Sequence, residues 1–119
     1  MNAGYTVTGV DAFTDYYARE VKERNLAALR TSGRFTLHDC ALADADWPRL
    51  LDGVSWIFHL AAQAGVRKSW GHDFRVYTSN NIEATQILLE AITHWSELER
   101  FVYLSSSSVY GENLALPVC

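Results

Sequence analysis

The sequence predicts an α/β fold in which a doubly wound parallel sheet carries helices on its faces. Short runs rich in β-branched and aromatic residues alternate along the chain with stretches of helical periodicity. Several of these runs are apolar without interruption, as expected for strands that are covered on both faces. A chain of 119 residues can enclose one modest core, so we expect a single domain over residues 1–119.

The first strand and helix are predicted over residues 5–10 and 18–30. Residues 5–10 are rich in β-branched side chains and run into Asp11, which then lies at the carboxyl end of a strand. Gly33 stands where a C-terminal cap of the following helix belongs. The apolar positions that fit a helical period are Val21, Leu26 and Leu29.

Two further strands, at residues 34–38 and 56–60, enclose a short helix. Asp46 precedes a tryptophan and a proline, which makes it a plausible N-cap for a helix that runs through Leu51. Gly53 is expected to close that helix. Because residues 56–60 are almost entirely apolar, we expect this strand to be covered on both faces.

A long helix over residues 73–95 and a fourth strand over residues 101–104 complete the pattern. The buried stripe of the helix is expected at Val76, Ile82, Ile87, Leu88, Ala91 and Ile92. Strands that alternate with helices in this way form right-handed βαβ units. The sequence therefore predicts a single layer of four parallel strands.

Composition excludes several classes of protein. Hydrophobic residues make up 49% of the chain and charged residues 20%, the balance of a soluble globular domain. No apolar run approaches the roughly 20 residues of a membrane-spanning helix, so no membrane partner is expected. The net charge is -4 and the basic residues are scattered, so no nucleic acid partner is expected either.

The cysteines and the N-terminal residues indicate in which cellular compartment the protein is located and whether it binds a metal. Cys40 and Cys119 are too few and too far apart for a disulfide framework or a pair of metal ligands. Residues 1–5 have neither the basic nor the apolar region of a secretion signal. We therefore expect a cytoplasmic protein with free thiols and no metal site.

Polar and small residues gather after the predicted strands, where ligands bind in sheets of this type. They are Asp11, Asp39, residues 59–67 and residues 105–108. Asp11 could accept hydrogen bonds from both hydroxyls of an adenosine ribose and repel a 2′-phosphate, which favours NAD over NADP. The alternative is an aspartate that begins a turn or caps a helix.

Asp39 and Cys40 follow the second predicted strand. The Asp39 carboxylate could reach the amino group of an adenine, and the Cys40 amide could reach a ring nitrogen. For Asp39, a solvated loop acid is nearly as good an explanation.

After the third strand, small residues let the backbone approach a flat ring or a pyrophosphate. His59 is better explained as a core or strand-end histidine than as a catalyst, since it has no partner motif.

The two asparagines in the long helix and the run of serines each have a structural explanation and a functional one. Asparagine is unfavourable inside helices, yet Asn80 and Asn81 both lie in the middle of the predicted helix. Asn80 could simply face water. The serines at 105–108 could form a flexible polar turn, but they directly follow an apolar strand.

Two segments carry a resemblance to a known family. His59-Leu60-Ala61-Ala62-Gln63 and Ser105-Ser106-Ser107-Ser108-Val109-Tyr110-Gly111 resemble the extended short-chain dehydrogenase/reductase family, the NAD-dependent epimerases and dehydratases. The continuation to Arg67, together with Phe13-Thr14-Asp15-Tyr16-Tyr17, is most similar to the UDP-glucuronate 4-epimerase branch. One departure is Ala84, where relatives usually have glycine.

The resemblance implies roles for particular residues. Ser106 would be the catalytic hydroxyl, and Gln63, Arg67, Ser107 and Ser108 would bind a UDP-sugar. NAD would be bound by Asp11, Asp39, Cys40, Leu60, Ala61, Ala62, Asn81 and Ser105. The whole enzyme would be a homodimer that epimerises the sugar by transient oxidation at C4.

The family's glycine-rich turn before Asp11 and its Tyr-x-x-x-Lys pair after the serines are both missing. The resemblance therefore implies a partial Rossmann fold that lacks its first strand and the C-terminal substrate domain. We expect such a fragment to have little turnover, weak NAD affinity and unpaired strand edges. Two alternatives stay open: a non-catalytic α/β remnant or interaction module, and a class I methyltransferase, which does not account for the two family segments.

Overall fold

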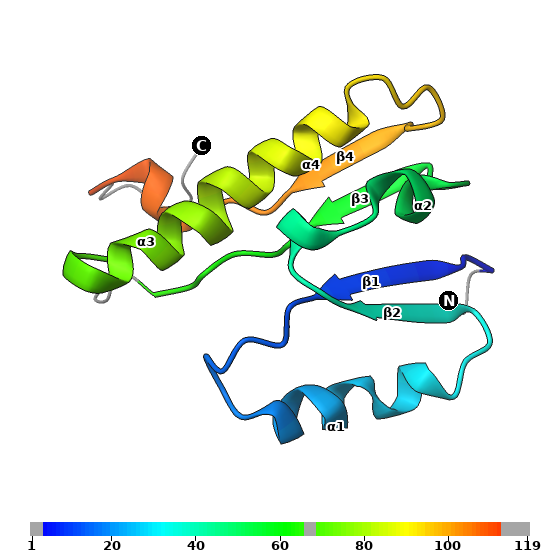
Figure 1. Cartoon of the computed structure of the whole chain (residues 1–119), viewed down its shortest axis with the longest axis horizontal. Helices are drawn as coiled ribbons and strands as arrows, with labels where there is room; N and C mark the ends of the chain where they lie inside the picture. The colour runs from blue at the N-terminus through cyan, green and yellow to red at the C-terminus, as the bar shows by residue number, and fades with distance from the viewer. Residues whose placement is uncertain (1–3, 66–68, 113–119) are drawn as a thin grey trace.

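Strands and helices alternate through the structure, a computed structural model that describes residues 4–65 and 69–112 (Figure 1). The strands are β1 (Val7–Asp11), β2 (Phe35–Asp39), β3 (Trp56–His59) and β4 (Arg100–Tyr103). The helices are α1 (Arg19–Arg30), α2 (Trp47–Leu51), α3 (Phe74–Tyr77) and α4 (Ala84–Ile92). The α/β class and the four predicted strands are confirmed, with bounds displaced by one or two residues.

The strands form two parallel pairs. β1 pairs with β2, with Val7 beside Phe35 and Asp11 beside Asp39. β3 pairs with β4, with Trp56 beside Arg100 and His59 beside Tyr103. Among the described residues these are two separate two-stranded sheets, which agrees with the expectation of a doubly wound sheet that lacks its first strand and has unpaired strand edges. Figure 1 shows the four arrows pointing the same way, with β1 and β3 on the inner sides of the two pairs.

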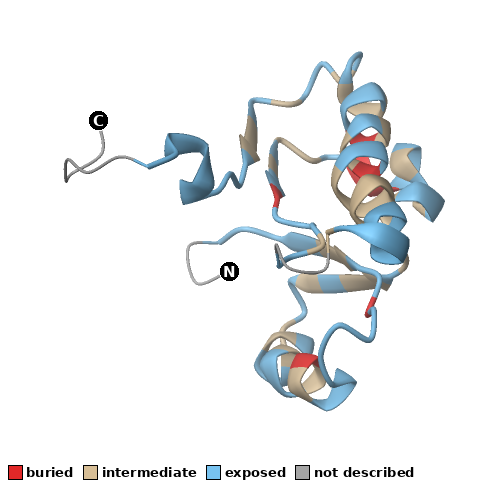
Figure 2. Ribbon diagram, turned by 90° about the vertical axis from the view of Figure 1, so that its left-hand side faces the viewer, coloured by how far each residue is buried: buried red, intermediate tan, exposed pale blue. Residues whose placement is uncertain are grey.

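The best-buried residues lie where α2 and α4 meet β3. Leu51 and Leu88 are each 3% exposed, Leu50 and Ala84 are nearly as well buried, and His59 is 4% exposed. Figure 2 shows the buried residues, in red, mainly at α4 and near α1. In the other sheet, a Cβ built on Gly9 would lie 3.3 Å from the ring of Phe35, so glycine permits that contact.

Much apolar surface stays open. The accessible surface of 9425 Å² exceeds the roughly 6,500 Å² of a compact monomer of this mass. The expectation that β3 is covered on both faces was wrong: Trp56 is 47% exposed and Phe58 is 58% exposed. Because alternate residues of a strand face opposite sides, α4 covers only the side that carries Ile57 and His59.

The predicted helix over residues 73–95 is interrupted. It begins with a 3₁₀ turn η2 (Gly71–Asp73), continues as α3, and passes through a π-helical turn η3 (Thr78–Glu83) before α4. In that turn the Ala84 N–H donates to the Ser79 carbonyl, five residues back. The wider turn changes the helical phase, so the stripe expected from a constant period was wrong at Val76 and Ile82, which are exposed.

The predicted helix ends were partly right. α1 ends at Arg30, and Thr31 forms the cap with its hydroxyl donating to the Ala28 carbonyl at 2.9 Å, so the expected Gly33 cap was wrong. Asp46 occupies the N-cap position of α2 but makes no capping hydrogen bond through its side chain. Gly53 closes this region with a φ of +69°, a conformation that favours glycine.

Candidate functional site

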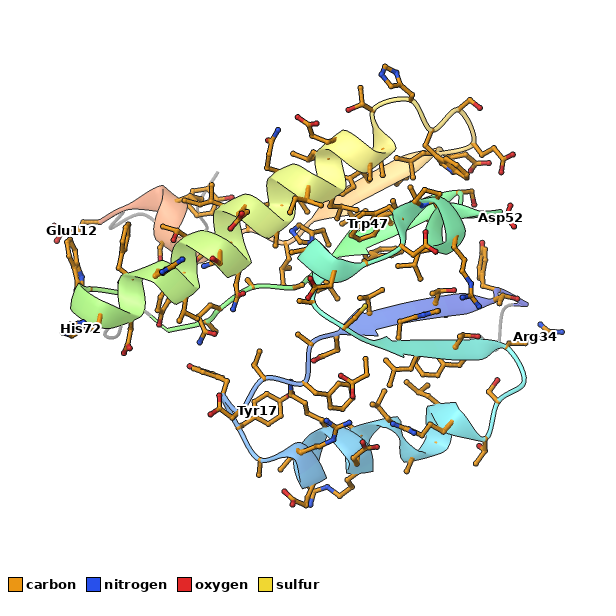
Figure 3. The ribbon with its side chains drawn as sticks, viewed as in Figure 1. Tyr17, Arg34, Trp47, Asp52, His72 and Glu112 are labelled. Atoms are coloured by element: carbon orange, nitrogen blue, oxygen red, sulfur yellow. The ribbon has the colours of Figure 1, made fainter. Side chains whose placement is uncertain are left out.

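The carboxyl ends of all four strands lie at one end of the molecule and carry the predicted site residues. Asp11 ends β1, Asp39 ends β2, and the loops after β3 and β4 begin beside one another, where the Leu104 N–H donates to the His59 carbonyl at 3.2 Å. In Figure 3, Tyr17 and His72 mark this end, whereas Arg34 and Asp52 mark the opposite end.

The loop after β1 is organised around the Asp11 carboxylate. Its Oδ1 accepts hydrogen bonds from the Phe13 N–H at 2.7 Å and from Lys22 Nζ at 3.0 Å. Phe13 has a φ of +47°, which is unusual for a residue with a side chain, and it is buried. No described residue donates to Oδ2 of Asp11, so this oxygen could accept a hydrogen bond from a ligand hydroxyl.

Lys22 is a site residue that the sequence analysis missed. Its side chain is only 8% exposed, and Nζ lies 5.2 Å from the ring centre of Phe13 and 5.1 Å from that of Tyr17. It borders a small cavity of about 180 Å³, lined by Asp11, Phe13, Tyr17, Lys22, Asn25, Leu26 and Leu37. The available signal was its spacing, because Lys22 precedes Leu26 by four residues and so falls on the apolar stripe of α1.

Arg19, which the sequence analysis also missed, holds the carboxylate at the end of β2. Its Nη2 lies 2.6 Å from Oδ2 of Asp39, and its guanidinium lies 4.4 Å from the ring centre of Phe13. The hydrogen bond with Asp39 raises the pKa of Arg19. The Cys40 amide, predicted to meet an adenine nitrogen, donates instead to the Asp11 carbonyl at 3.1 Å and so joins β1 to β2.

The loop at residues 60–65 follows β3 and is held by the adjoining helix. The Gln63 N–H donates to Asn81 Oδ1 at 2.6 Å, and Asn81 Nδ2 donates back to the Gln63 carbonyl at 3.2 Å. Tyr77 donates to the Ala64 carbonyl at 3.2 Å. The side chains of Ala61 and Ala62 are exposed, so this backbone is accessible.

Gly65 brings this loop close to the loop after β1. Its φ is +95°, and a Cβ built on it would lie 3.1 Å from the hydroxyl oxygen of Tyr16. Any other residue would therefore be strained in backbone conformation and crowded by the tyrosine. The loops after β1 and β3 therefore lie close together at Gly65 and Tyr16.

His59 is a buried residue at the end of β3, as the sequence analysis expected. Its Nε2 lies 2.9 Å from Thr85 Oγ1, and its ring packs beside those of Phe101 and Tyr103, with centroids 6.2 and 5.5 Å away. Its surroundings are thus a hydroxyl and two aromatic rings. Burial lowers the pKa of His59 below the ordinary histidine value.

We expect the free energy of unfolding to fall as the pH is lowered from about 6.5, the ordinary histidine pKa, toward the lower pKa of folded His59. In that interval the unfolded chain binds a proton that the folded chain does not, so acid favours unfolding. Urea unfolding at a series of pH values measures this slope. It should be lost in His59→Gln and kept in His94→Gln, which changes an exposed histidine. A slope that survives in His59→Gln would contradict the assignment.

The serines after β4 form a capped turn. Ser106 is extended and stands at the N-cap of a 3₁₀ turn η4 (Ser107–Tyr110), where its Oγ accepts a hydrogen bond from the Ser108 N–H at 3.2 Å. This bond uses a lone pair of Oγ and leaves the hydroxyl proton available for donation. The side chains of Ser105, Ser107 and Ser108 are exposed.

The structure thus brings the described candidates to one edge, in two groups on two sheets. Arg67 lies outside the described residues. Across residues 4–65 and 69–112, no group of three His, Cys, Asp or Glu side chains is arranged to hold a metal ion, and Cys40 is a free thiol. None of the helices in that part of the chain has the length and apolar character needed to cross a membrane.

Comparison with known proteins identifies related sequences and structures. Residues 1–117 match the model of the NAD dependent epimerase/dehydratase family. An uncharacterized UDP-glucose epimerase of Bacillus subtilis is 46% identical over 91% of this chain and 34% of its own length. UDP-glucuronate 4-epimerase 3 of Arabidopsis thaliana is 36% identical over 96% of this chain and 27% of its own length.

A solved structure supports the same relation. The UDP-glucuronic acid 4-epimerase from Bacillus cereus, crystallised with UDP-glucuronic acid and NAD, superimposes with a TM-score of 0.90 and 40% identity. The match covers 96% of this chain and 36% of that enzyme. The chain therefore spans between about a quarter and about a third of the length of these relatives and corresponds to a part of a Rossmann-type fold.

Proposed function

This chain belongs to the NAD-dependent epimerase/dehydratase family, and from that relation we propose that it forms part of the cofactor and substrate site of a UDP-sugar 4-epimerase. Residues 1–119 would be one partial NAD-binding domain. The observation that carries the proposal is the gathering of an acid, a small-residue loop and a serine cluster at the carboxyl ends of four parallel strands. The similarity to UDP-glucuronate 4-epimerases favours a UDP-hexuronate as the substrate.

The residues at β1 and β2 suit the adenosine half of NAD. Oδ2 of Asp11 is available for a ribose hydroxyl, while Lys22 and the Phe13 amide hold Oδ1 in place. Asp39 would contact the adenine through Oδ1, because Arg19 already binds Oδ2. Because the Cys40 amide is bonded to Asp11, we assign Cys40 to the adenine subsite as part of the backbone wall.

The residues after β3 and β4 suit the nicotinamide and the sugar. When bound, NAD supplies a reversible hydride acceptor for C4 of the sugar. The proposed cofactor contacts here are Leu60, Ala61, Ala62, Asn81 and Ser105. Ser106 would act on the sugar 4-hydroxyl by donating its Oγ proton in a hydrogen bond to that oxygen, since no described residue accepts this proton. Gln63, Arg67, Ser107 and Ser108 would bind the sugar or its diphosphate.

An NAD titration of the chain followed by amide NMR spectra tests this proposal. We expect shifts at the carboxyl edge, around Asp11, Ala61 and Ser106, and none around Arg34 and Asp52 at the opposite edge. UDP-glucuronate should shift Gln63 and Ser107. Absence of shifts at millimolar NAD would favour a non-catalytic α/β module, and shifts confined to the opposite edge would overturn the site.

Asp11→Asn is expected to weaken NAD binding about tenfold or more, because charge-assisted hydrogen bonds to the ribose are replaced by weaker neutral ones. Asp52→Asn, which removes the same charge at the far end of the strands, should leave the affinity unchanged. The dissociation constant from the NMR titration measures both. Equal effects of the two substitutions would show that overall charge, rather than the ribose contact, governs binding.

The other candidate functions have less support. A class I methyltransferase also has an acid after its second strand, but the family relation and the loops after β3 and β4 favour the epimerase. We further propose that the whole enzyme is a cytoplasmic homodimer, as the family resemblance implies. The chain alone is expected to show little turnover.

A further inference from the structure

We propose that Thr85 and His59 are positioning residues that set the place of the loop at residues 60–65, acting through Asn81. The inference rests on the proposed function only for the identity of the ligand that the loop binds. The geometry of the loop is a property of the free chain. The three residues come from the end of β3, the π-helical turn η3 and the first turn of α4.

The three residues form a continuous series of hydrogen bonds. Thr85 Oγ1 donates to the Asn81 carbonyl at 2.8 Å and lies 2.9 Å from His59 Nε2. A hydroxyl has a single hydrogen, which Thr85 uses toward Asn81. His59 Nε2 must therefore be the donor in the second bond, so neutral His59 carries its proton on Nε2.

These hydrogen bonds fix the position of Asn81, whose side chain holds the loop at residues 60–65. The Asn81 side chain binds both the backbone N–H and the backbone carbonyl of Gln63, with the short N–H contact at 2.6 Å. Asn81 lies in η3, where the backbone bond reaches five residues instead of four and the normal helical register is lost. A π-helical turn is less regular than an α-helix, so a side-chain bond to its carbonyl can decide how it is oriented.

The buried histidine ties Thr85 to the sheet. His59 is 4% exposed and packs beside the rings of Phe101 and Tyr103, which belong to the neighbouring strand. Thr85 is thereby tied to the sheet as well as to its own helix. The loop at residues 60–65 leaves that same sheet one residue after His59. A loop held at both ends on one rigid frame is pre-organised for a ligand.

Thr93 provides a matched control for Thr85. Both threonines lie at α4 and donate to the carbonyl four residues back, Thr93 to Leu89 at 2.9 Å. Only Thr85 is also bonded to a histidine among the described contacts. A comparison of Thr85→Val with Thr93→Val therefore separates the link to His59 from the ordinary effect of losing a helix hydroxyl.

The test is amide hydrogen exchange at Gln63 in the free chain, together with the imidazole ¹⁵N spectrum of His59. We expect Thr85→Val to speed exchange at Gln63 by about tenfold, Thr93→Val to leave it unchanged, and Thr85→Ser to restore it. In the unsubstituted chain, the spectrum should show the tautomer protonated on Nε2. That measurement stands even if Thr85→Val fails to fold.

Two results would overturn the inference: equal exchange at Gln63 in Thr85→Val and in the unsubstituted chain, or a neutral His59 protonated on Nδ1. Neither measurement needs NAD. A failure of the proposed function would instead appear as missing NAD shifts in a chain whose Gln63 exchange still depends on Thr85. The two failures are therefore distinguishable.

Discussion

Replacing Leu88 with alanine is expected to lower the free energy of unfolding by about 2–5 kcal/mol and so remove much of the stability of the chain. Leu88 is 3% exposed and packs in the largest group of buried residues in the described part of the chain, between α4, α2 and β3. Truncating a buried leucine costs about 2–5 kcal/mol, a large part of the roughly 5–15 kcal/mol that stabilises a typical domain. The open surface places this chain at the low end of that range. Thermal and urea unfolding followed by circular dichroism measure the loss.

Leu89→Ala is the control for this prediction. Leu89 is the next residue of the same helix, with the same chemistry and propensity, but it is 41% exposed. Its loss should cost less than about 1 kcal/mol because little buried surface is removed. If the two substitutions lowered the unfolding midpoint equally, the core would not lie between α2 and α4 as described.

We expect the chain to associate with itself through the outer face of β3, and Phe58→Lys to weaken that association. The outer face of β3 presents Trp56 and Phe58, with ring centres 6.2 Å apart, and Leu60 and Leu104 are 61% and 65% exposed. Exposed apolar faces next to unpaired strand edges favour association. Burying a phenylalanine contributes about 1.5–3 kcal/mol, so the dissociation constant should rise roughly tenfold to a hundredfold. Sedimentation velocity over a concentration series measures it.

Ala27→Lys adds the same charge on the exposed side of α1 and should leave association nearly unchanged. This comparison separates the loss of an apolar contact from a general effect of net charge. Equal dissociation by the two variants would indicate charge repulsion. An unsubstituted chain that sediments as a monomer at every concentration would contradict the prediction outright.

The prediction that polar residues gather at the carboxyl ends of the strands follows from local sequence patterns. Residues 5–10, 34–38, 56–60 and 101–104 are distinguished by apolar and β-branched content, and each observed strand agrees within two residues. Once the strands are parallel, chain direction alone brings Asp11, Asp39 and Ser106 to the same end. That part of the site needed no knowledge of packing. The individual roles of these residues stay predictions.

The errors have a different origin. A constant period of 3.6 residues predicted that Val76 and Ile82 are buried, but the π-helical turn around Asn81 changes the phase between α3 and α4. The sequence analysis assigned no role to Lys22 or Arg19. Both are held by carboxylates at strand ends, and those pairings depend on how α1 lies against the sheet.

By itself, the sequence determined the order of strands and helices and the edge at which polar residues collect, because both depend on short-range periodicity and chain direction. Only the tertiary structure decided that one face of β3 is open and that His59, Thr85 and Asn81 are linked. Those features depend on contacts between residues far apart in the chain, such as Asn81 with Gln63 and Lys22 with Asp11. Local propensity carries no information about such contacts, since packing alone brings the partners within hydrogen-bond distance.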